Sequence, residues 1–429
     1  MSLDRINLGD GVNLNLIESD KFKTNYIGIS LIAPLGDDAA ANALMLKVLR
    51  RGSANYDTMT KINRRLDFLY GASLGMKNIK CGEAQIIGLS SDMLDNRYSL
   101  DGGDIFGGTA DLACDILFNP LIENRAFKKE YVDGEKTNLK DDIAAQINNK
   151  NAYAVRRCQE IMCAGEKFAV CELGTPETVD ALDGAMLYAH YRKAVSTYPV
   201  EIYYVGRYEG RRDAIIAKFR EMTAALERKP VAIPAAQVIK SAAYKGETVE
   251  EMEVNQGKLT LGFRTPITVA SPEYPALALF NELYGGSPTS KLFVNVREKL
   301  SLCYYCRSIP EALKGIFTVA CGIEVDNKQK AQDEILRQLD AVKNGEITAE
   351  ELSNAKAGLI SDYRTLSDSA GAMEMWYVRR NFAGVPRTPE EVAAAIDTVT
   401  ADEIKAVAQS LTLDTVYFLK GTLKGEAEA

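Results

Sequence analysis

Histidine is almost missing from this chain of 429 residues, which contains only His190. Zinc hydrolases usually hold their metal through histidine side chains, often two on one face of a helix. A single histidine cannot supply such a pair. It also leaves only one candidate base for a serine or cysteine nucleophile. The composition therefore argues against the common hydrolytic sites that depend on histidine.

Long apolar runs and a strong charge of one sign are also missing. No run of about 18 or more apolar residues occurs, so no membrane-spanning helix is expected. The net charge of −8 gives no general attraction for nucleic acid or anionic membranes. Residues 1–10 are polar and lack the apolar segment of a signal peptide. We therefore expect a cytoplasmic protein with no nucleic-acid partner.

The eight cysteines have no regular spacing and sit in apolar or strand-like surroundings. Without an export signal, they are expected to be reduced and mostly buried thiols. Cys303 and Cys306 form a C-x-x-C pair, but side chains three apart on a strand point to opposite faces. A second grouping matches no common zinc spacing: Cys158, Cys163, Cys171 and His190. Neither group is therefore expected to form a metal or redox centre.

Apolar periodicity predicts the same order of elements in both halves of the chain. Each half has a strand, two helices, a hairpin, further helices and a closing strand. The opening strands are expected at 25–32 and 258–264, and the closing strands at 200–206 and 415–420. The repetition predicts an α+β fold of two similar duplicated domains. Each is expected to be a mostly antiparallel sheet with helices packed on one face.

The boundaries between these domains are expected where proline and alanine interrupt the apolar pattern. Residues 227–250 hold Pro230 and Pro234 and few periodic apolar positions, which is typical of a linker. The expected domains are therefore residues 1–226 and residues 251–429.

Several segments together resemble the insulinase (pitrilysin) family of zinc peptidases, which includes the mitochondrial processing peptidases. Residues 109–121 and the acidic positions that follow resemble the helical stretch of the family's first domain. Residues 174–179 and the His190-Tyr-Arg segment resemble the part that closes that domain. Residues 285–304 resemble the family's C-terminal signature. The resemblance covers nearly the whole chain and implies the processing-peptidase fold.

The same resemblance implies that the metal site is degenerate. The family's metal helix reads H-x-x-E-H, and counting back from a following glycine, Gly52, aligns it with residues 43–47. Ala43 and Lys47 stand at the histidine positions, and Leu46 stands at the position of the general base. The third ligand, a glutamate seven residues after another, becomes Asp142 after Glu135. Alanine, leucine and a charged lysine offer no lone pair to zinc. We expect no catalytic residue, no metal and no cofactor, although active relatives use zinc.

A charged lysine could take over the electrostatic role of the missing metal. If the fold is kept, Lys47 lies near the two acids of the old site. We predict an ion pair of Lys47 with Asp142 or with Glu135. The alternative is that Lys47 points to solvent and Leu46 merely fills the pocket.

The second half keeps more of the family's pattern. Members use an arginine and a tyrosine seven residues apart to hold the substrate backbone, and Arg297 and Tyr304 fit that spacing. The alternative is that Arg297 pairs with a carboxylate and Tyr304 packs in the sheet. In the family a substrate strand adds to a sheet edge, which here corresponds to residues 73–79.

These observations leave three functions open. The first is an inactive homologue that binds peptides or unfolded polypeptide, or that serves as the partner of an active insulinase-family subunit in a heterodimer. The second is a metal-dependent endopeptidase that acts through an unrecognised site. The third is a structural assembly subunit. The missing ligands favour the first, so the chain by itself is not expected to be an enzyme.

Overall fold

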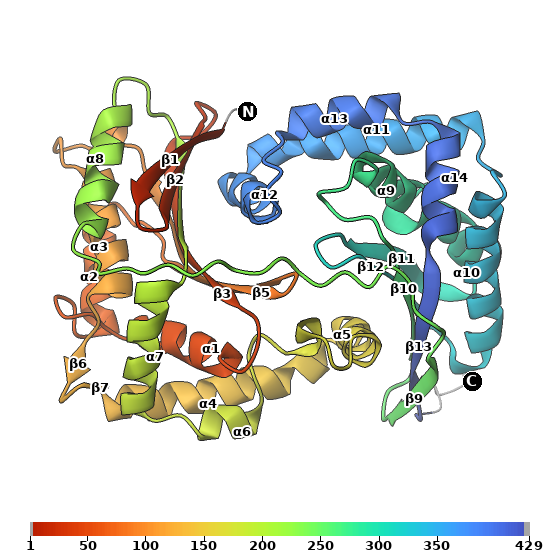
Figure 1. Cartoon of the computed structure of the whole chain (residues 1–429), viewed down its shortest axis with the longest axis horizontal. Coiled ribbons are helices and arrows are strands. Elements are labelled where there is room, and N and C mark those ends of the chain that lie inside the picture. The colour runs from red at the N-terminus through yellow and green to blue at the C-terminus, as the bar shows by residue number, and fades with distance from the viewer. Residues whose placement is uncertain (1–2, 424–429) are drawn as a thin grey trace. The chain divides into compact units, whose positions relative to one another are not determined.

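The computed structural model describes residues 3–423 and divides the chain into two compact units (Figure 1). The N-terminal unit comprises Met1–Ala144, Val170–Ala235 and Ser367–Arg379, and the C-terminal unit comprises Ala145–Ala169, Ala236–Leu366 and Arg380–Ala429. Each unit combines one large sheet with helices, so the predicted α+β class is confirmed. Within residues 3–423, no helix is both long and apolar enough to cross a membrane.

The N-terminal unit is built on a six-stranded sheet in the order β1-β2-β8-β3-β5-β4. Neighbouring strands are antiparallel, except that β2 and β8 are parallel. The strands are β1 (Leu3–Gly9), β2 (Val12–Glu18), β3 (Thr24–Pro34), β4 (Gly75–Cys81), β5 (Ala84–Leu94) and β8 (Val200–Gly206). The strands expected from alternation at 25–32 and 200–206 are confirmed.

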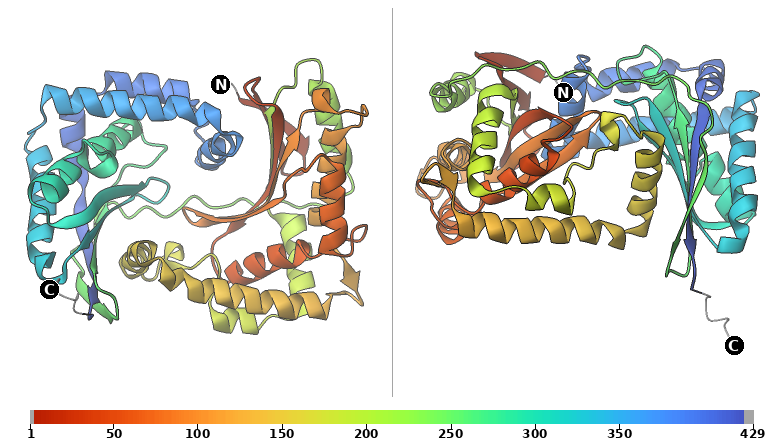
Figure 2. Two further views of the ribbon diagram at one scale, coloured as in Figure 1. Left: turned by 180° about the vertical axis from the view of Figure 1, so that it is seen from behind. Right: turned by 60° about the horizontal axis from the view of Figure 1, so that its bottom comes forward.

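Helices cover one face of this sheet, as Figures 1 and 2 show from several sides. They are α1 (Ala39–Leu49), α2 (Met59–Phe68), α3 (Ile105–Phe118), α7 (Gly184–Thr197) and α8 (Arg212–Thr223), with α4 (Lys129–Ala145) and α6 (Pro176–Asp180) beside them. Ile27, Ile29 and Leu31 of β3 point into this face and share one core with the helices. Each such fully buried side chain contributes about 1.5–3 kcal/mol of burial free energy.

The C-terminal unit repeats this topology. Its five-stranded sheet has the order β11-β12-β10-β13-β9, which matches β4-β5-β3-β8-β2 of the first unit. The parallel pair recurs at the corresponding place, between β13 and β9. The strands are β9 (Gly246–Met252), β10 (Gly257–Arg264), β11 (Cys303–Glu311), β12 (Ile316–Ile323) and β13 (Thr412–Gly421). The internal duplication is therefore present in strand order and in strand direction.

One strand lies where the sequence predicts a linker. β9 begins at Gly246 and therefore overlaps residues 227–250. It is the edge strand of its sheet, and Val249 is half exposed. Its sequence, GETVEEM, lacks apolar alternation because neither of its faces is fully buried.

The helices of the C-terminal unit lie mainly on one face of its sheet. They are α9 (Tyr274–Asn281), α10 (Lys328–Lys343), α11 (Ala349–Thr365), α13 (Pro389–Thr398) and α14 (Ala401–Ser410). The capping box expected at the start of α11 is present. The amide of Glu351 donates to Thr348 Oγ1 at 3.1 Å, and the amide of Thr348 donates to Glu351 Oε2 at 2.9 Å.

Each sheet also receives a helix from the other half of the sequence. α5 (Lys150–Met162) packs on the C-terminal sheet, where a side chain at Gly262 would meet Met162 Sδ at 2.7 Å. The segment Ser367–Arg379, which includes most of α12 (Ala370–Phe382), belongs to the N-terminal unit. The linear division at residues 226 and 251 stays a prediction about domains, and the compact units differ from it in these two segments.

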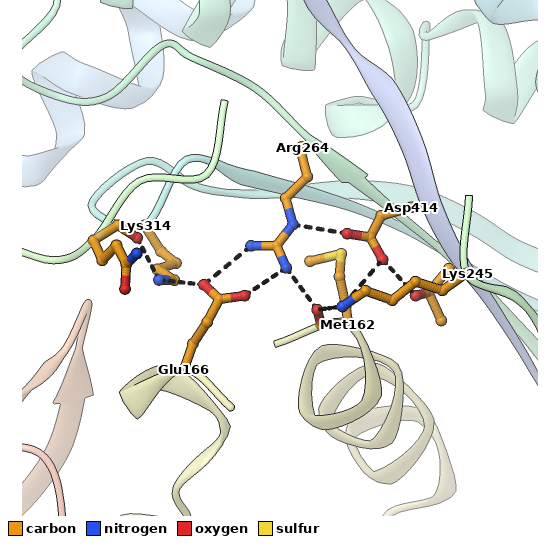
Figure 3. A network of polar contacts seen from close by, with 8 residues as sticks. Met162, Glu166, Lys245, Arg264, Lys314 and Asp414 are labelled. Atoms are coloured by element: carbon orange, nitrogen blue, oxygen red, sulfur yellow. Dashed lines mark hydrogen bonds and ion pairs between the residues drawn. The ribbon is translucent and has the colours of Figure 1, made fainter. Parts of the chain in front are cut away.

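A buried charge network holds the end of α5 to the C-terminal sheet (Figure 3). The carboxylate of Glu166 accepts from Arg264 at 2.7 Å and from Lys314 at 2.6 Å. Arg264 also binds Asp414 at 2.9 Å, and its Nη2 donates to the Met162 carbonyl at 2.6 Å. Burial alone would raise the pKa of Glu166, but hydrogen bonds from Arg264 and Lys314 lower it. Lys245 also lies 4.0 Å from Asp414, so two acids and three bases compensate one another.

In the N-terminal unit, a smaller cluster of buried polar side chains holds α12 to the sheet. The buried carboxylate of Glu374 on α12 accepts from Lys77 on β4 and from the hydroxyl of Tyr26 on β3. Gly28 leaves room for this carboxylate, because a Cβ there would lie 2.0 Å from Glu374 Oε1. Burial and the charge of Glu374 raise the pKa of Tyr26.

The only histidine is a buried structural residue. His190 Nε2 lies 2.8 Å from Asn42 Oδ1, and Asn42 in turn donates to Gln85 Oε1 at 2.9 Å. This arrangement suits a neutral ring with its proton on Nε2. Burial lowers the pKa of His190, although the charge of Asp38 opposes the shift.

We predict that Glu166→Gln lowers the free energy of unfolding by about 3–5 kcal/mol, because it leaves buried cations without their partner. Urea unfolding followed by circular dichroism measures the loss. The matched control is Glu160→Gln on α5, the helix that precedes Glu166 in the chain. Glu160 pairs with the partly exposed Arg157, and such a pair contributes less than about 1 kcal/mol. Equal losses in the two variants would contradict the structural role of the network.

We predict that His190 makes the protein less stable as the pH falls. The unfolded chain takes up a proton near pH 6.5, whereas the folded pKa is lower, so the stability present above about pH 6.5 declines below it. His190→Gln keeps an amide donor for Asn42 and removes the titration. The slope of unfolding free energy between about pH 7 and pH 5.5 should therefore be shallower in the variant. An unchanged slope would show that His190 titrates alike in both states.

Candidate functional site

The helix that corresponds to the family's metal helix is α1, and it lies within the hydrophobic core. All of its residues are buried except Lys47. Ala43 and Leu46 are only 2% and 4% exposed, and Ala43 belongs to the core cluster of the unit. The positions that a ligand and a general base would occupy are therefore packing residues.

The predicted ion pair of Lys47 is confirmed. Lys47 Nζ lies 2.6 Å from Asp142 Oδ2, and the two side chains are 30% and 52% exposed. Asp142 comes from α4, so the contact joins the two helices on which the family's site is built. The alternative, in which Lys47 points to solvent alone, is wrong. Leu46 is buried.

Glu135, the other acid of the old site, has a different partner. Its Oε1 lies 3.2 Å from Arg51 Nη1, and its Oε2 accepts from Asn138 at 3.0 Å. Arg51 also lies over the ring of Tyr131, 5.3 Å from the centroid. Arg51 is therefore a site residue that the sequence alone did not single out. Its position four residues after Lys47 was the available signal, since that spacing places both on one side of a helical turn.

These residues do not fit a zinc ion. Ala43 and Leu46 have no donor atoms, and the ammonium group of Lys47 already occupies Asp142. Zinc sites in proteins use three or four nitrogen, sulfur or oxygen ligands. Among residues 3–423, no three His, Cys, Asp or Glu side chains are grouped in a way that could hold a metal ion. No hydrolytic step through a metal follows from this arrangement.

Arg297 and Tyr304 lie on either side of a tight turn in the C-terminal unit. Arg297 belongs to the helical segment η5 (Phe293–Lys299), and Tyr304 lies at the start of β11. Between them, Ser301 has a left-handed backbone with φ of 49°, and its amide donates to the Arg297 carbonyl at 3.0 Å. The turn therefore brings the start of β11 back to the end of η5.

Both side chains are accessible, and both contact carboxylates of the chain. Arg297 Nε lies 3.6 Å from Glu298 Oε1, and the guanidinium lies 4.6 Å from the centroid of the Phe293 ring. The hydroxyl of Tyr304 donates to Glu324, and this hydrogen bond raises the pKa of Tyr304. Tyr304 is 54% exposed, so it is not packed within the sheet. Their role in holding a substrate stays a prediction.

The expected edge, residues 73–79, corresponds to β4 at the end of the N-terminal sheet. β4 pairs with β5 alone, and most of its side chains are partly exposed. Besides Lys77, which pairs with Glu374, two of its side chains bind backbone carbonyls of residues 170–172. Asn78 donates to the Glu172 carbonyl at 3.1 Å and Lys80 to the Val170 carbonyl at 3.2 Å. The strand is therefore held firmly while one side of its backbone has no strand neighbour.

Comparison with known proteins agrees with this geometry. The family model described as the peptidase M16 inactive domain matches residues 186–359. The Bacillus subtilis protein named probable inactive metalloprotease YmfF is 32% identical over 414 residues, which cover 96% of each chain. Another Bacillus subtilis protein, named uncharacterized zinc protease YmxG, is 23% identical over 70% of this chain and 71% of its own.

Two solved structures have the same fold over the full length. The crystal structure of a conserved protein from Enterococcus faecalis is 30% identical, with a TM-score of 0.88 over 99% of this chain and 100% of its own. The peptidase M16 inactive domain from Pseudomonas fluorescens is 18% identical, with a TM-score of 0.79 over 100% of both chains. Together with the degenerate site on α1, these likenesses show that the chain belongs to the M16 family, the insulinase and pitrilysin peptidases that its sequence resembles, as an inactive homologue.

Proposed function

We propose that this protein binds extended or unfolded polypeptide without cleaving it. One observation carries the proposal: the helix of the catalytic positions has become a core helix, while the surrounding fold is kept over the whole chain. Loss of the ligands removes the chemistry. It does not remove the surfaces with which a peptidase fold binds a polypeptide.

Each unit offers one such surface. In the N-terminal unit, the free side of β4 supplies backbone amide and carbonyl groups that can pair with an added strand. In the C-terminal unit, Arg297 and Tyr304 supply a charged donor and a hydroxyl that are both exposed. Neither surface depends on a metal. Backbone pairing gives little preference for sequence, which suits unfolded polypeptide as a ligand.

A second role is that of partner to an active family member in a heterodimer. Bacillus subtilis has both an M16-like relative named as inactive and another named as a zinc protease, so one cell can hold both kinds of chain. We propose the cytoplasm as the setting, because all eight cysteines are free thiols, as in reducing compartments. Mixing the chain with an H-x-x-E-H-bearing relative from its own organism tests the role: peptidase activity above that of the relative alone supports it, and an unchanged rate argues against it.

We predict that Arg297→Ala weakens binding of a fluorescently labelled, reduced and carboxymethylated polypeptide by about tenfold, the loss expected for one charged hydrogen bond. Fluorescence anisotropy measures the dissociation constant. Tyr304→Phe removes a single neutral hydroxyl and should weaken binding by a smaller factor. The matched control is Lys299→Ala, which removes one positive charge from the same helical segment at an exposed position.

Three results would change the conclusion. Equal losses in Arg297→Ala and Lys299→Ala would mean that net charge, and not Arg297, attracts the polypeptide. No measurable affinity in the unmodified chain would favour a structural assembly subunit. Cleavage of the polypeptide that stops when a chelator is added would show an active endopeptidase with an unrecognised metal site.

A further inference from the structure

Three of the eight cysteines come together on one face of the C-terminal sheet. Cys306 on β11 lies directly opposite Cys321 on β12. Cys303 lies opposite Ile323 and Tyr305 opposite Gly322, so Tyr304 is an extra residue in the β11 strand. This bulge returns Cys303 to the face of Cys306. The expectation that the two point to opposite faces is therefore wrong, because it assumed an unbroken alternation.

The three cysteines therefore share one face of the sheet, with Cys306 and Cys321 paired across the two strands. Cys303 is partly exposed, whereas Cys306 and Cys321 are buried. The face they share is that of Phe317 and Val319 on β12, and β11 packs there against η5, the segment of Arg297. One partly exposed cysteine therefore lies on the same face as two buried ones.

The pKa of Cys303 is lowered and those of Cys306 and Cys321 are raised, which favours reaction at Cys303. Hydrogen bonds from Cys306 and Cys321, together with the charge of Arg297, lower the pKa of Cys303. Burial raises the pKa of Cys306, and the hydrogen bond with Cys303 raises that of Cys321. Of the three thiols, Cys303 is therefore the one whose thiolate form is favoured, and it is also the one that is partly exposed. Cys171, the other partly exposed cysteine, lies in the N-terminal unit and provides an internal comparison.

We propose that Cys303 is a site of reversible oxidation by peroxides and that a neighbouring buried thiol, Cys306 or Cys321, resolves the oxidised form. The Cys303 thiolate attacks one oxygen of hydrogen peroxide, the O–O bond breaks, and with one proton the products are a sulfenic acid and water. The thiol of Cys306 or Cys321 then attacks the sulfenic sulfur, which releases a second water and forms a disulfide. In total, two thiols lose two electrons and two protons, and the peroxide is reduced to two waters.

The bulge gives this oxidation a structural consequence. Tyr304, the extra residue, directly follows Cys303, and the turn before it leads back to Arg297. A bond from Cys303 to either buried sulfur fixes the backbone at the point where Tyr304 leaves the strand. The oxidation itself does not depend on the proposed polypeptide binding, and its test is a chemical one.

The test is peptide mapping of the full chain after mild treatment with hydrogen peroxide. Trypsin places Cys303 and Cys306 in the peptide 300–307 and Cys321 in the peptide 315–328. A bond to Cys321 therefore joins the two peptides, and a bond to Cys306 closes a loop within the first. Either product, reversed by dithiothreitol, supports the proposal. Iodoacetamide at pH 6 should also modify Cys303 at least about tenfold faster than Cys171.

Variants separate the attacking thiol from the resolving ones. Cys303→Ser should abolish disulfide formation at the same peroxide dose. The double variant Cys306→Ser/Cys321→Ser should keep the reactive thiol, and its sulfenic acid should be trapped by dimedone at Cys303. Disulfide formation that persists at an equal rate in Cys303→Ser would overturn the proposal. So would equal alkylation rates at Cys303 and Cys171, a result that requires no variant to fold.

Discussion

The burial of α1, which is complete except at one residue, limits how charge can be placed around it in the N-terminal unit. α1 has one residue that is not buried, Lys47, and this residue leaves the core at the point where α4 brings its acids. Lys47 and Arg51 each take one acid, Asp142 and Glu135. Carboxylates that approach a core helix need a nearby positive charge, which a metal supplies in active relatives of the family. Here two basic side chains supply it, and the helix is free to be apolar elsewhere.

Pairing of acids with basic side chains recurs where each sheet receives a helical segment from the other half of the sequence. In both units the segment brings a buried glutamate to basic side chains of the sheet: Glu374 to Lys77, and Glu166 to Arg264 and Lys314. Pairs of this kind add little net stability compared with apolar packing, but breaking one is costly. The two units are thus alike in strand order and also in the buried ion pairs that hold these segments to the sheets.

The sequence predicts the features that depend on near neighbours in the chain. Strand alternation, the capping box of Thr348 and Glu351 and the repeated order of elements all follow from local spacing. The resemblance placed Lys47 beside Asp142. Two features were predicted wrongly because they depart from the regular pattern. β9 is an edge strand without apolar alternation, and the bulge at Tyr304 breaks the period of two in β11. The partner of Glu374 is 297 positions away, and no local pattern indicates it.

The central claim is that the old metal site has lost its capacity for zinc. The most direct test is the zinc content of the purified, untagged chain, prepared without chelators and measured by inductively coupled plasma mass spectrometry beside an H-x-x-E-H-bearing relative. Lys47 and the apolar residues of α1 predict less than about a tenth of an equivalent in this chain and close to one in the relative. Close to one equivalent in this chain would contradict the claim, because a ligand set outside the aligned positions would then have to exist.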